Sequence, residues 1–296
     1  MSLEDRVLEA LVEAIRVAET RLPLDVYEAL ASWRDRVDGV ARAQLEAILE
    51  NVELAAREGR PICQDTGLIS FYVSLPDDYP VRLSRLHRLL REAVRRATRL
   101  VPLRPNAVHP VTHENTGDNT GLHVPVVHVE PGEGGDLVVT VVPKGGGSEY
   151  PSRLYMIPPA AGLPEALRRV VDAVVEADGL PCPPTIVGVG IGGTVEEAVA
   201  LAKRAAVLRP VGSRNGDERL AALEERLLGA LNRLGIGPMG LGGEPTVLDV
   251  HVEVAHRHPA TYPVAVVFNC WAARRATVRI APGGSWEIIS RHYEPG

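Results

Sequence analysis

A chain of 296 residues is long enough to form two modest domains, or one large domain with two lobes. Its net charge of −6 argues against nucleic acid as the main partner, and no apolar run is long enough to cross a bilayer, which argues against a membrane protein. The acidic, amphipathic N-terminus lacks the basic and apolar stretches of a secretory signal, so we expect a cytoplasmic protein.

Helices are predicted from residue 2 to about residue 58. Ser2 followed by Asp5 resembles a capping box, which is typical of a helix start. Apolar residues then recur at helical spacing. Pro23 is expected to end the first helix and Gly59 the last.

Beyond this segment, helices and strands are mixed. Residue preference and apolar periodicity predict strands over 68–75, 123–129, 137–142, 185–190, 247–255 and 263–269, two more near the C-terminus, and helices over 83–100, 163–178, 195–207 and 217–234. The glycine-rich segment 131–135 joins the second and third strands, and therefore predicts a β-hairpin.

The order of these elements lacks the regular alternation of a doubly wound Rossmann sheet. We therefore predict an α+β fold, a two-lobed mixed α/β domain with an N-terminal helical segment. The expected segments are 1–58 (helical), 59–150 (first lobe) and 151–296 (second lobe).

Three cysteines, Cys63, Cys182 and Cys270, lie in predicted loops or at strand ends. An odd number in an apparently cytoplasmic chain argues against a disulfide framework. Any one of them could be a small buried apolar residue, but three at loops or strand ends favour metal ligands. Spacing alone supports zinc bound by three cysteines and a histidine as well as it supports an iron–sulfur cluster with one open iron.

Several motifs, in the same order, resemble class I fumarases and L-tartrate dehydratases from roughly residue 50 to the C-terminus. They are Pro61-Ile62-Cys63-Gln64-Asp65-Thr66-Gly67, Asn115-Thr116-Gly117-Asp118-Asn119-Thr120, Lys144-Gly145-Gly146-Gly147-Ser148-Glu149, Gly188-Val189-Gly190-Ile191-Gly192-Gly193-Thr194 and Leu234-Gly235-Ile236-Gly237-Pro238-Met239-Gly240-Leu241-Gly242-Gly243. One departure is Tyr150, where the family pattern has Asn.

The resemblance implies a [4Fe-4S] cluster held by Cys63, Cys182 and Cys270, with one open iron. It also implies a hydro-lyase acting on a small dicarboxylate. We expect reversible hydration of fumarate to (S)-malate, with L-tartrate dehydration as the alternative. Because family members are divided into α and β parts, the resemblance further implies that this chain is an α subunit, that a separate β subunit completes the site, and that the assembly is a higher oligomer.

The resemblance also assigns roles to individual residues. It places Asp65 and His258 among the catalytic residues, with Asp65 assisting proton transfer. It places Gln64, Arg104 and Gly146 in contact with the substrate. The chemistry agrees, since a guanidinium matches a carboxylate and a glycine amide can approach an anion closely. Without the resemblance, Asp65 would be interpreted as a turn residue that bonds its own backbone.

Two alternatives come from other classes of function. The segment 188–193 fits G-x-G-x-x-G between a strand and a helix, which would suit a nucleotide-dependent oxidoreductase with Arg209 near the ribose-phosphate. However, no clear strand ending in Asp or Glu follows that helix, and Pro210 interrupts the segment. We therefore expect these glycines to let the chain pass close to a cluster on Cys182. The other alternative is a non-catalytic iron–sulfur or zinc scaffold.

Overall fold

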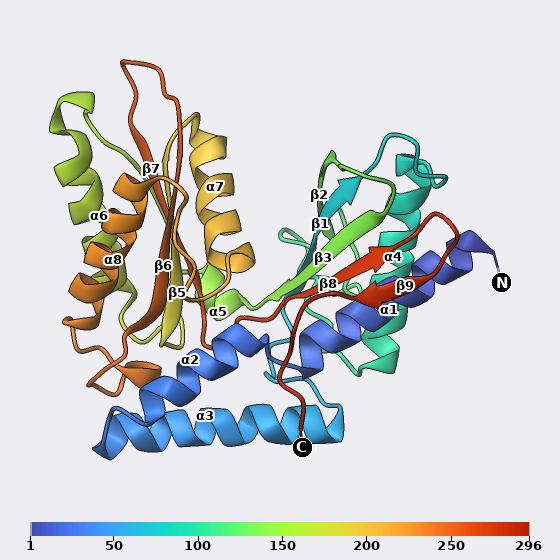
Figure 1. The fold of residues 1–296 in the computed structure, drawn as a ribbon, viewed down its shortest axis with the longest axis horizontal. Coiled ribbons are helices and arrows are strands. Elements are labelled where there is room, and N and C mark those ends of the chain that lie inside the picture. The colour runs from blue at the N-terminus through green and yellow to red at the C-terminus, as the bar shows by residue number, and fades with distance from the viewer. Residues whose placement is uncertain (1, 296) are drawn as a thin grey trace. The chain divides into compact units, whose positions relative to one another are not determined.

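The computed structural model describes residues 2–295 and shows a mixed α/β fold that contains two compact units (Figure 1). Unit 1 comprises the chain up to Leu24, Asn51–Gly145 and the chain from Arg274 onward, whereas unit 2 comprises Asp25–Glu50 and Gly146–Ala273. The predicted fold class is confirmed, with N-terminal helices, two mixed sheets and no closed barrel among the described residues. The units differ from the three consecutive segments expected, because the C-terminal part returns to unit 1.

Unit 1 is built on a five-stranded sheet with the order β2-β1-β3-β8-β9. β1 and β2 are parallel, and the other pairs are antiparallel. The elements of the unit are α1 (Leu3–Thr20), β1 (Leu68–Leu75), α4 (Leu83–Leu100), β2 (Val126–Pro131), β3 (Leu137–Lys144), β8 (Ala276–Ile280) and β9 (Trp286–Ile288).

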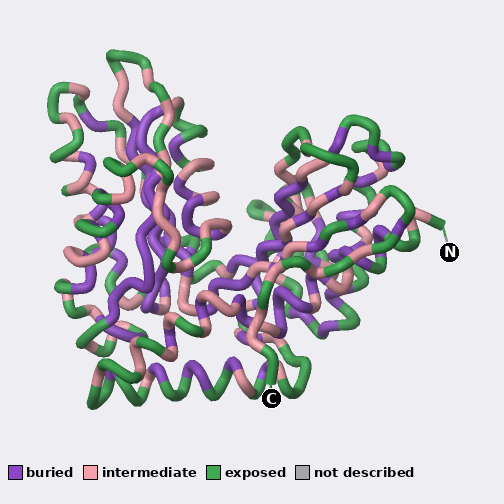
Figure 2. Tube along the Cα trace, in the orientation of Figure 1, coloured by how far each residue is buried: buried purple, intermediate pink, exposed green. Residues whose placement is uncertain are grey.

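The core of unit 1 lies between its sheet and the helices α1 and α4 (Figure 2). The predicted capping box is confirmed, since the Ser2 hydroxyl accepts from the Asp5 amide and the Asp5 carboxylate accepts from the Ser2 amide. The apolar residues that predicted helix α1 are all buried: Val7, Leu8, Leu11, Ile15 and Ala18. Burial of one apolar stripe per helix is what stabilises this layer.

The predicted hairpin between β2 and β3 is wrong. β1 lies between these two strands and pairs with both, in parallel with β2 and antiparallel with β3. The connecting loop passes over the end of β1, where the Gly132 amide donates to the Leu75 carbonyl at 2.9 Å. A β-carbon at position 132 would lie 2.9 Å from the Pro76 nitrogen, so glycine is needed for this crossing.

Unit 2 is built on a four-stranded sheet with the order β4-β7-β5-β6, in which only β5 and β6 are parallel. Helix α7 covers one face of this sheet, and helices α6 and α8 cover the other (Figure 1). Its elements are α2 (Leu24–Arg34), the first part of α3 (Gly39–Glu58), α5 (Gly146–Glu149), β4 (Arg153–Met156), a 3-10 turn (Pro159–Ala161), α6 (Gly162–Ala177), β5 (Thr185–Gly192), α7 (Val195–Leu208), α8 (Glu218–Asn232), a second 3-10 turn (Pro238–Gly240), β6 (Val247–Ala255) and β7 (Pro263–Asn269).

The glycines of β5 serve helix packing. A β-carbon at Gly188 would lie 2.0 Å from the Ala202 carbonyl oxygen, and one at Gly190 would lie 2.0 Å from the Ala198 carbonyl oxygen. Both of these oxygens belong to α7, so the glycines allow the helix to lie directly on the strand. This corrects the expectation that these glycines make room for a cluster, and it explains them without nucleotide binding.

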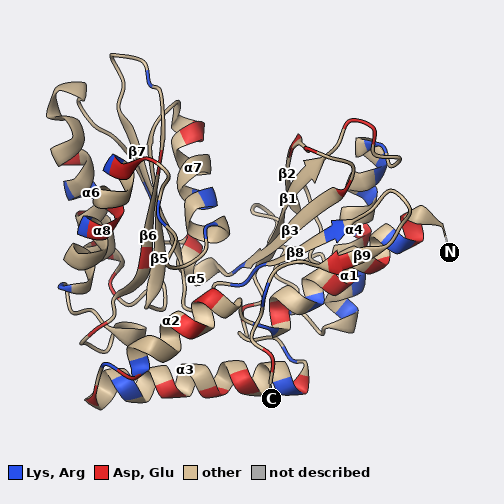
Figure 3. Cartoon of the chain, viewed as in Figure 1, with Lys and Arg blue, Asp and Glu red and all other residues tan. Residues whose placement is uncertain are grey.

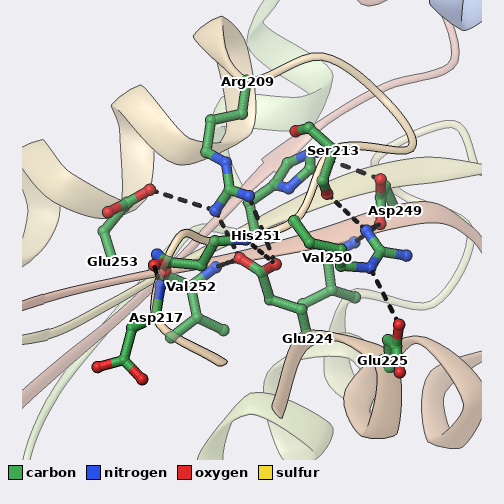
Figure 4. Close-up of polar contacts among 12 residues, drawn as sticks. Arg209, Ser213, Asp217, Glu224, Glu225, Asp249, Val250, His251, Val252 and Glu253 are labelled. Atoms are coloured by element: carbon green, nitrogen blue, oxygen red, sulfur yellow. Dashed lines mark hydrogen bonds and ion pairs between the residues drawn. The ribbon is translucent and has the colours of Figure 1, made fainter. Parts of the chain in front are cut away.

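Two side chains cover the outer edge of β6 at Val252. The Glu224 carboxylate accepts from the Val252 amide at 2.8 Å, and the Asn215 side-chain amide donates to the Val252 carbonyl at 2.9 Å. Glu224 is completely buried and pairs with Arg209, which also bonds Glu253 at 3.2 Å (Figure 4). Arg209 therefore has a structural role, instead of the nucleotide-binding role considered from the sequence.

Charged side chains lie mainly on helices and loops, and the two central strands β5 and β7 of unit 2 carry none (Figure 3). Such strands are typical of a sheet that is buried on both faces. No helix within residues 2–295 is both long and apolar enough to cross a membrane.

Candidate functional site

Cys63 lies in the loop between α3 and β1, in unit 1. The loop is fixed on the N-terminal side of the cysteine, where the Ile62 amide donates to the Glu19 carbonyl at 2.9 Å and the Ile62 carbonyl accepts from the Asn51 side chain at 2.8 Å. Cys63 itself is half-buried, and its sulfur lies 3.6 Å from the side-chain oxygen of the exposed Gln64. The thiol is therefore presented from an anchored backbone.

Asp65 is held by the turn that follows the cysteine. Its Oδ1 accepts from the Gly67 amide at 2.9 Å and lies 3.4 Å from the Asn106 side-chain nitrogen. A β-carbon at Gly145 would lie 2.7 Å from Asp65 Oδ2, so the glycine-rich loop is in close contact with this carboxylate. The turn interpretation of Asp65 is thus confirmed, and the same geometry fixes the carboxylate beside the loop whose glycines were expected to bind substrate.

Arg104 is exposed, and its backbone is held against the Cys63 loop. Its carbonyl accepts from the Thr66 hydroxyl at 3.2 Å and from the Asn119 side chain at 3.0 Å. Asn119 is 2% exposed, and its Oδ1 also accepts from the Asn106 amide at 2.6 Å. Asn106 and Asn119 are therefore organising residues that sequence reasoning missed, although Asn119 stands in one of the motifs quoted for the family.

Cys182 and Cys270 lie at the same end of the unit 2 sheet. Cys182 shortly precedes β5 and Cys270 directly follows β7, and Ile186 of β5 pairs with Asn269 of β7. The Trp271 amide donates to the Cys182 carbonyl at 3.3 Å, which ties the two segments together. Cys182 has φ of +53°, a left-handed conformation that is uncommon for a non-glycine residue and is often found at functional sites.

Gly146 and His258 occupy other positions. Gly146 is exposed and begins the short helix α5. His258 is exposed in the turn between β6 and β7, where its Nδ1 accepts from the Ala260 amide at 3.1 Å. His258 and Cys270 thus flank β7 at opposite ends, and seven extended residues span roughly 20 Å. The structure does not bring them together, and the catalytic role of His258 stays a prediction.

The three cysteines partly fit a shared metal cofactor. None is in a disulfide and each is half-buried, so each could present a thiolate. The structure brings the segments of Cys182 and Cys270 together, whereas Cys63 belongs to the other unit. Within residues 2–295, no group of three or more His, Cys, Asp or Glu side chains is arranged to hold a metal ion.

A buried ion pair behind the Cys63 loop is a further feature that sequence reasoning missed. Arg274 Nη1 donates to Glu19 Oε2 at 2.6 Å, and the two side chains are 2% and 0% exposed. Burial raises the pKa of Glu19 to about 7, and the Asp65 charge contributes in the same direction, although Arg274 acts in the opposite one. Glu19 lies within a regular helix, so no local pattern distinguishes it from a surface residue.

Comparison with known proteins places this chain in a family. Residues 8–279 match the family model described as "Fumarate hydratase (Fumerase)". The chain belongs to this fumarate hydratase family. Membership in this hydro-lyase family carries with it the iron–sulfur dependence that the motifs implied.

Several named relatives can be aligned with this chain over nearly its whole length. A Methanocaldococcus jannaschii protein, provisionally named as an L(+)-tartrate dehydratase subunit alpha, is 40% identical over 279 residues, which are 93% of this chain and 98% of the relative. The L(+)-tartrate dehydratase subunits alpha of Escherichia coli K12 and Shigella sonnei are each 38% identical over 289 residues, which are 97% of this chain and 94% of the relative. These names agree with the tartrate alternative better than with the fumarate hydration expected first.

Proposed function

We propose that this chain is the α subunit of a [4Fe-4S] hydro-lyase that dehydrates L-tartrate, and that a separate β subunit completes its active site in the cytoplasm. The observation that carries the proposal is the 38–40% identity to tartrate dehydratase α subunits over more than nine-tenths of the chain. The Cys63 loop supports it, because this loop carries a candidate ligand, Gln64 and Asp65 in consecutive positions on an anchored backbone.

Cys63, Cys182 and Cys270 would hold the cluster, and thiolates are the usual protein ligands of such clusters. When bound, the open iron supplies Lewis-acid chemistry toward a hydroxyl and a carboxylate. Arg104 is exposed and would donate two parallel N–H bonds to the other carboxylate of the substrate. An amide of the glycine-rich loop, that of Gly146, would bind the same anion.

Asp65 would assist proton transfer. Its Oδ1 is already bonded to the Gly67 amide, so its carboxylate is oriented before any substrate arrives. Gln64 is exposed next to it, and would contribute to substrate binding through its side-chain amide. Loss of a proton from one carbon and of hydroxide from the next, together one water, turns tartrate into an enol, which becomes oxaloacetate by tautomerisation. Preorganised donors around the substrate carboxylate would lower the barrier, since negative charge builds up there.

Reversible hydration of fumarate to (S)-malate is the second candidate. It is favoured by the description of the family model, which names fumarate hydratase over residues 8–279. L-tartrate and (S)-malate differ by one hydroxyl group. Each has two carboxylates, which would be bound by the same residues.

Anaerobic co-expression of this chain with its β subunit provides the test. We expect the purified complex to contain iron and sulfide and to convert L-tartrate to oxaloacetate with a larger kcat/KM than it shows for (S)-malate. The reverse preference would establish the fumarate candidate in its place. The chain without the β subunit serves as the control, and robust turnover by it would contradict the two-subunit proposal.

The ligand set is tested in the same complex. Cys63→Ser, Cys182→Ser and Cys270→Ser are each expected to abolish iron retention, measured as iron and sulfide per chain together with the visible absorption of the cluster. A variant that retains full iron content and activity would remove that cysteine from the ligand set.

A further inference from the structure

The Glu19–Arg274 ion pair is connected to the Cys63 loop on both sides of the cysteine. On the N-terminal side, the Glu19 carbonyl accepts from the Ile62 amide at 2.9 Å. On the C-terminal side, Arg274 Nη2 donates to the Asp65 carbonyl at 2.9 Å. The main chain of Glu19 thus binds the residue immediately before Cys63, and the Arg274 side chain, which is paired with the Glu19 carboxylate, binds the residue two positions after it.

The burial of the loop residues agrees with these two anchoring contacts. Ile62 and Thr66 are buried, whereas Gln64 is exposed and Cys63 and Asp65 are half-buried. The buried positions are therefore fixed against the core, and the three consecutive residues with proposed roles face outward between them. Both contacts are made to main-chain groups of the loop, so they constrain the path of its backbone without occupying the site itself.

Arg274 is also close in sequence to a second candidate ligand, since it follows Cys270 by four residues. Its Nη1 bonds Glu19 in α1 and its Nη2 bonds Asp65 in the loop. A forked guanidinium can make both bonds at once, whereas a lysine ammonium on a flexible stem is a single point of charge. Arginine is therefore the residue that this double contact requires.

We propose that Glu19 and Arg274 are positioning residues, and that together they hold the Cys63–Asp65 segment in the conformation that presents Cys63 to the cluster and Asp65 to the substrate. This inference rests on the proposed function for its catalytic meaning. The contacts that carry it all lie within unit 1 and among described residues.

Arg274→Lys tests the proposal, because it keeps the positive charge beside Glu19 but removes the fork. The matched control is Arg209→Lys, which makes the same change in unit 2, where the half-buried Arg209 bonds the buried Glu224 and also Glu253. Amide hydrogen exchange of the segment 60–67 is measured in the full chain without iron. We expect Arg274→Lys to accelerate this exchange about tenfold or more, as for the loss of one charge-assisted hydrogen bond, and Arg209→Lys to leave it unchanged.

A second readout uses the complex with the β subunit. Arg274→Lys is expected to lose iron to a chelator faster than the wild type and to show a changed visible spectrum, while Arg209→Lys follows the wild type. Unchanged loop exchange and unchanged iron loss in a folded Arg274→Lys chain would overturn the proposal. If that variant does not fold, Arg274→Met decides, because an unbranched apolar side chain can fill the buried space but lacks both N–H donors. Faster exchange in 60–67 is then expected, and wild-type exchange would overturn the proposal.

The two proposals fail separately. A wild-type complex that takes up no iron would contradict the proposed function, whereas the exchange comparison, made without iron, still decides the positioning role.

Discussion

Replacing Glu19 with glutamine should make the chain more stable at neutral pH, although the change breaks a buried ion pair. The ordinary pKa of a glutamate is 4.5, and burial raises that of Glu19 to about 7 in the folded chain. Between these two values the folded chain holds a proton that the unfolded chain has released. Stability contributed by this group is therefore complete below pH 4.5 and is lost as the pH rises toward 7.

The expected magnitude follows from the size of the shift. A shift from 4.5 to about 7 corresponds to about 3 kcal/mol, at roughly 1.4 kcal/mol for each pH unit. Glutamine resembles the protonated glutamate in shape and charge at every pH. Glu19→Gln should therefore match the wild type near pH 4.5 and exceed its free energy of unfolding by about 3 kcal/mol near pH 8.

Urea denaturation followed by circular dichroism, at several pH values between 4.5 and 8 and without iron, measures this difference. Other titrating groups are common to both proteins and cancel in the comparison. Glu9→Gln, an exposed change on the same helix, controls for the loss of one negative charge. If Glu19→Gln is less stable than the wild type at pH 8, the ionised pair stabilises the fold and the reasoning from burial is refuted.

Three further outcomes are expected. Gly190→Ala should lower the free energy of unfolding by about 1–3 kcal/mol in urea titration, because its β-carbon would overlap the Ala198 carbonyl oxygen. A Gly229→Ala change at a half-buried position of α8, where the nearest atom to the new β-carbon is Arg233 Nη1 at 3.5 Å, should cost far less. Asn119→Ala should cost about 2 kcal/mol, because it leaves the buried Thr98 hydroxyl and Arg104 carbonyl without this donor, and an unchanged urea midpoint would contradict that role. Arg104→Ala should lower kcat/KM of the two-subunit enzyme by orders of magnitude with little effect on folding, and a loss of only a few-fold would exclude Arg104 from the site.

Local structure could be predicted from the sequence where one short pattern determines it. The strand over 68–75 and the helix over 83–100 begin and end where predicted, because residue preference and apolar periodicity are properties of neighbouring residues. The pairing of β2 and β3 could not be predicted in this way. A glycine-rich loop usually joins adjacent strands, and nothing in the sequence of this loop indicates that β1 lies between them.

The candidate site shows the same division. The family motifs lead to Cys63, Gln64 and Asp65, and the structure places these residues on one anchored loop. Glu19 and Arg274 could not be found from any pattern, because the two are separated by 255 positions and each looks ordinary among its neighbours. The G-x-G-x-x-G pattern was also ambiguous, since close helix packing and nucleotide binding require glycine for the same steric reason.

The side-chain bonds at Val252, on the border strand β6, limit how unit 2 can bind another chain. Many proteins capture an extended peptide by adding it as a new strand at a sheet edge. Here the outward-facing amide and carbonyl of Val252 already bond Glu224 and Asn215, so an incoming strand would first have to displace them. A second subunit that docks on this unit without displacing these two side chains would bind through side chains and loops, or approach the opposite border strand β4, which is only four residues long.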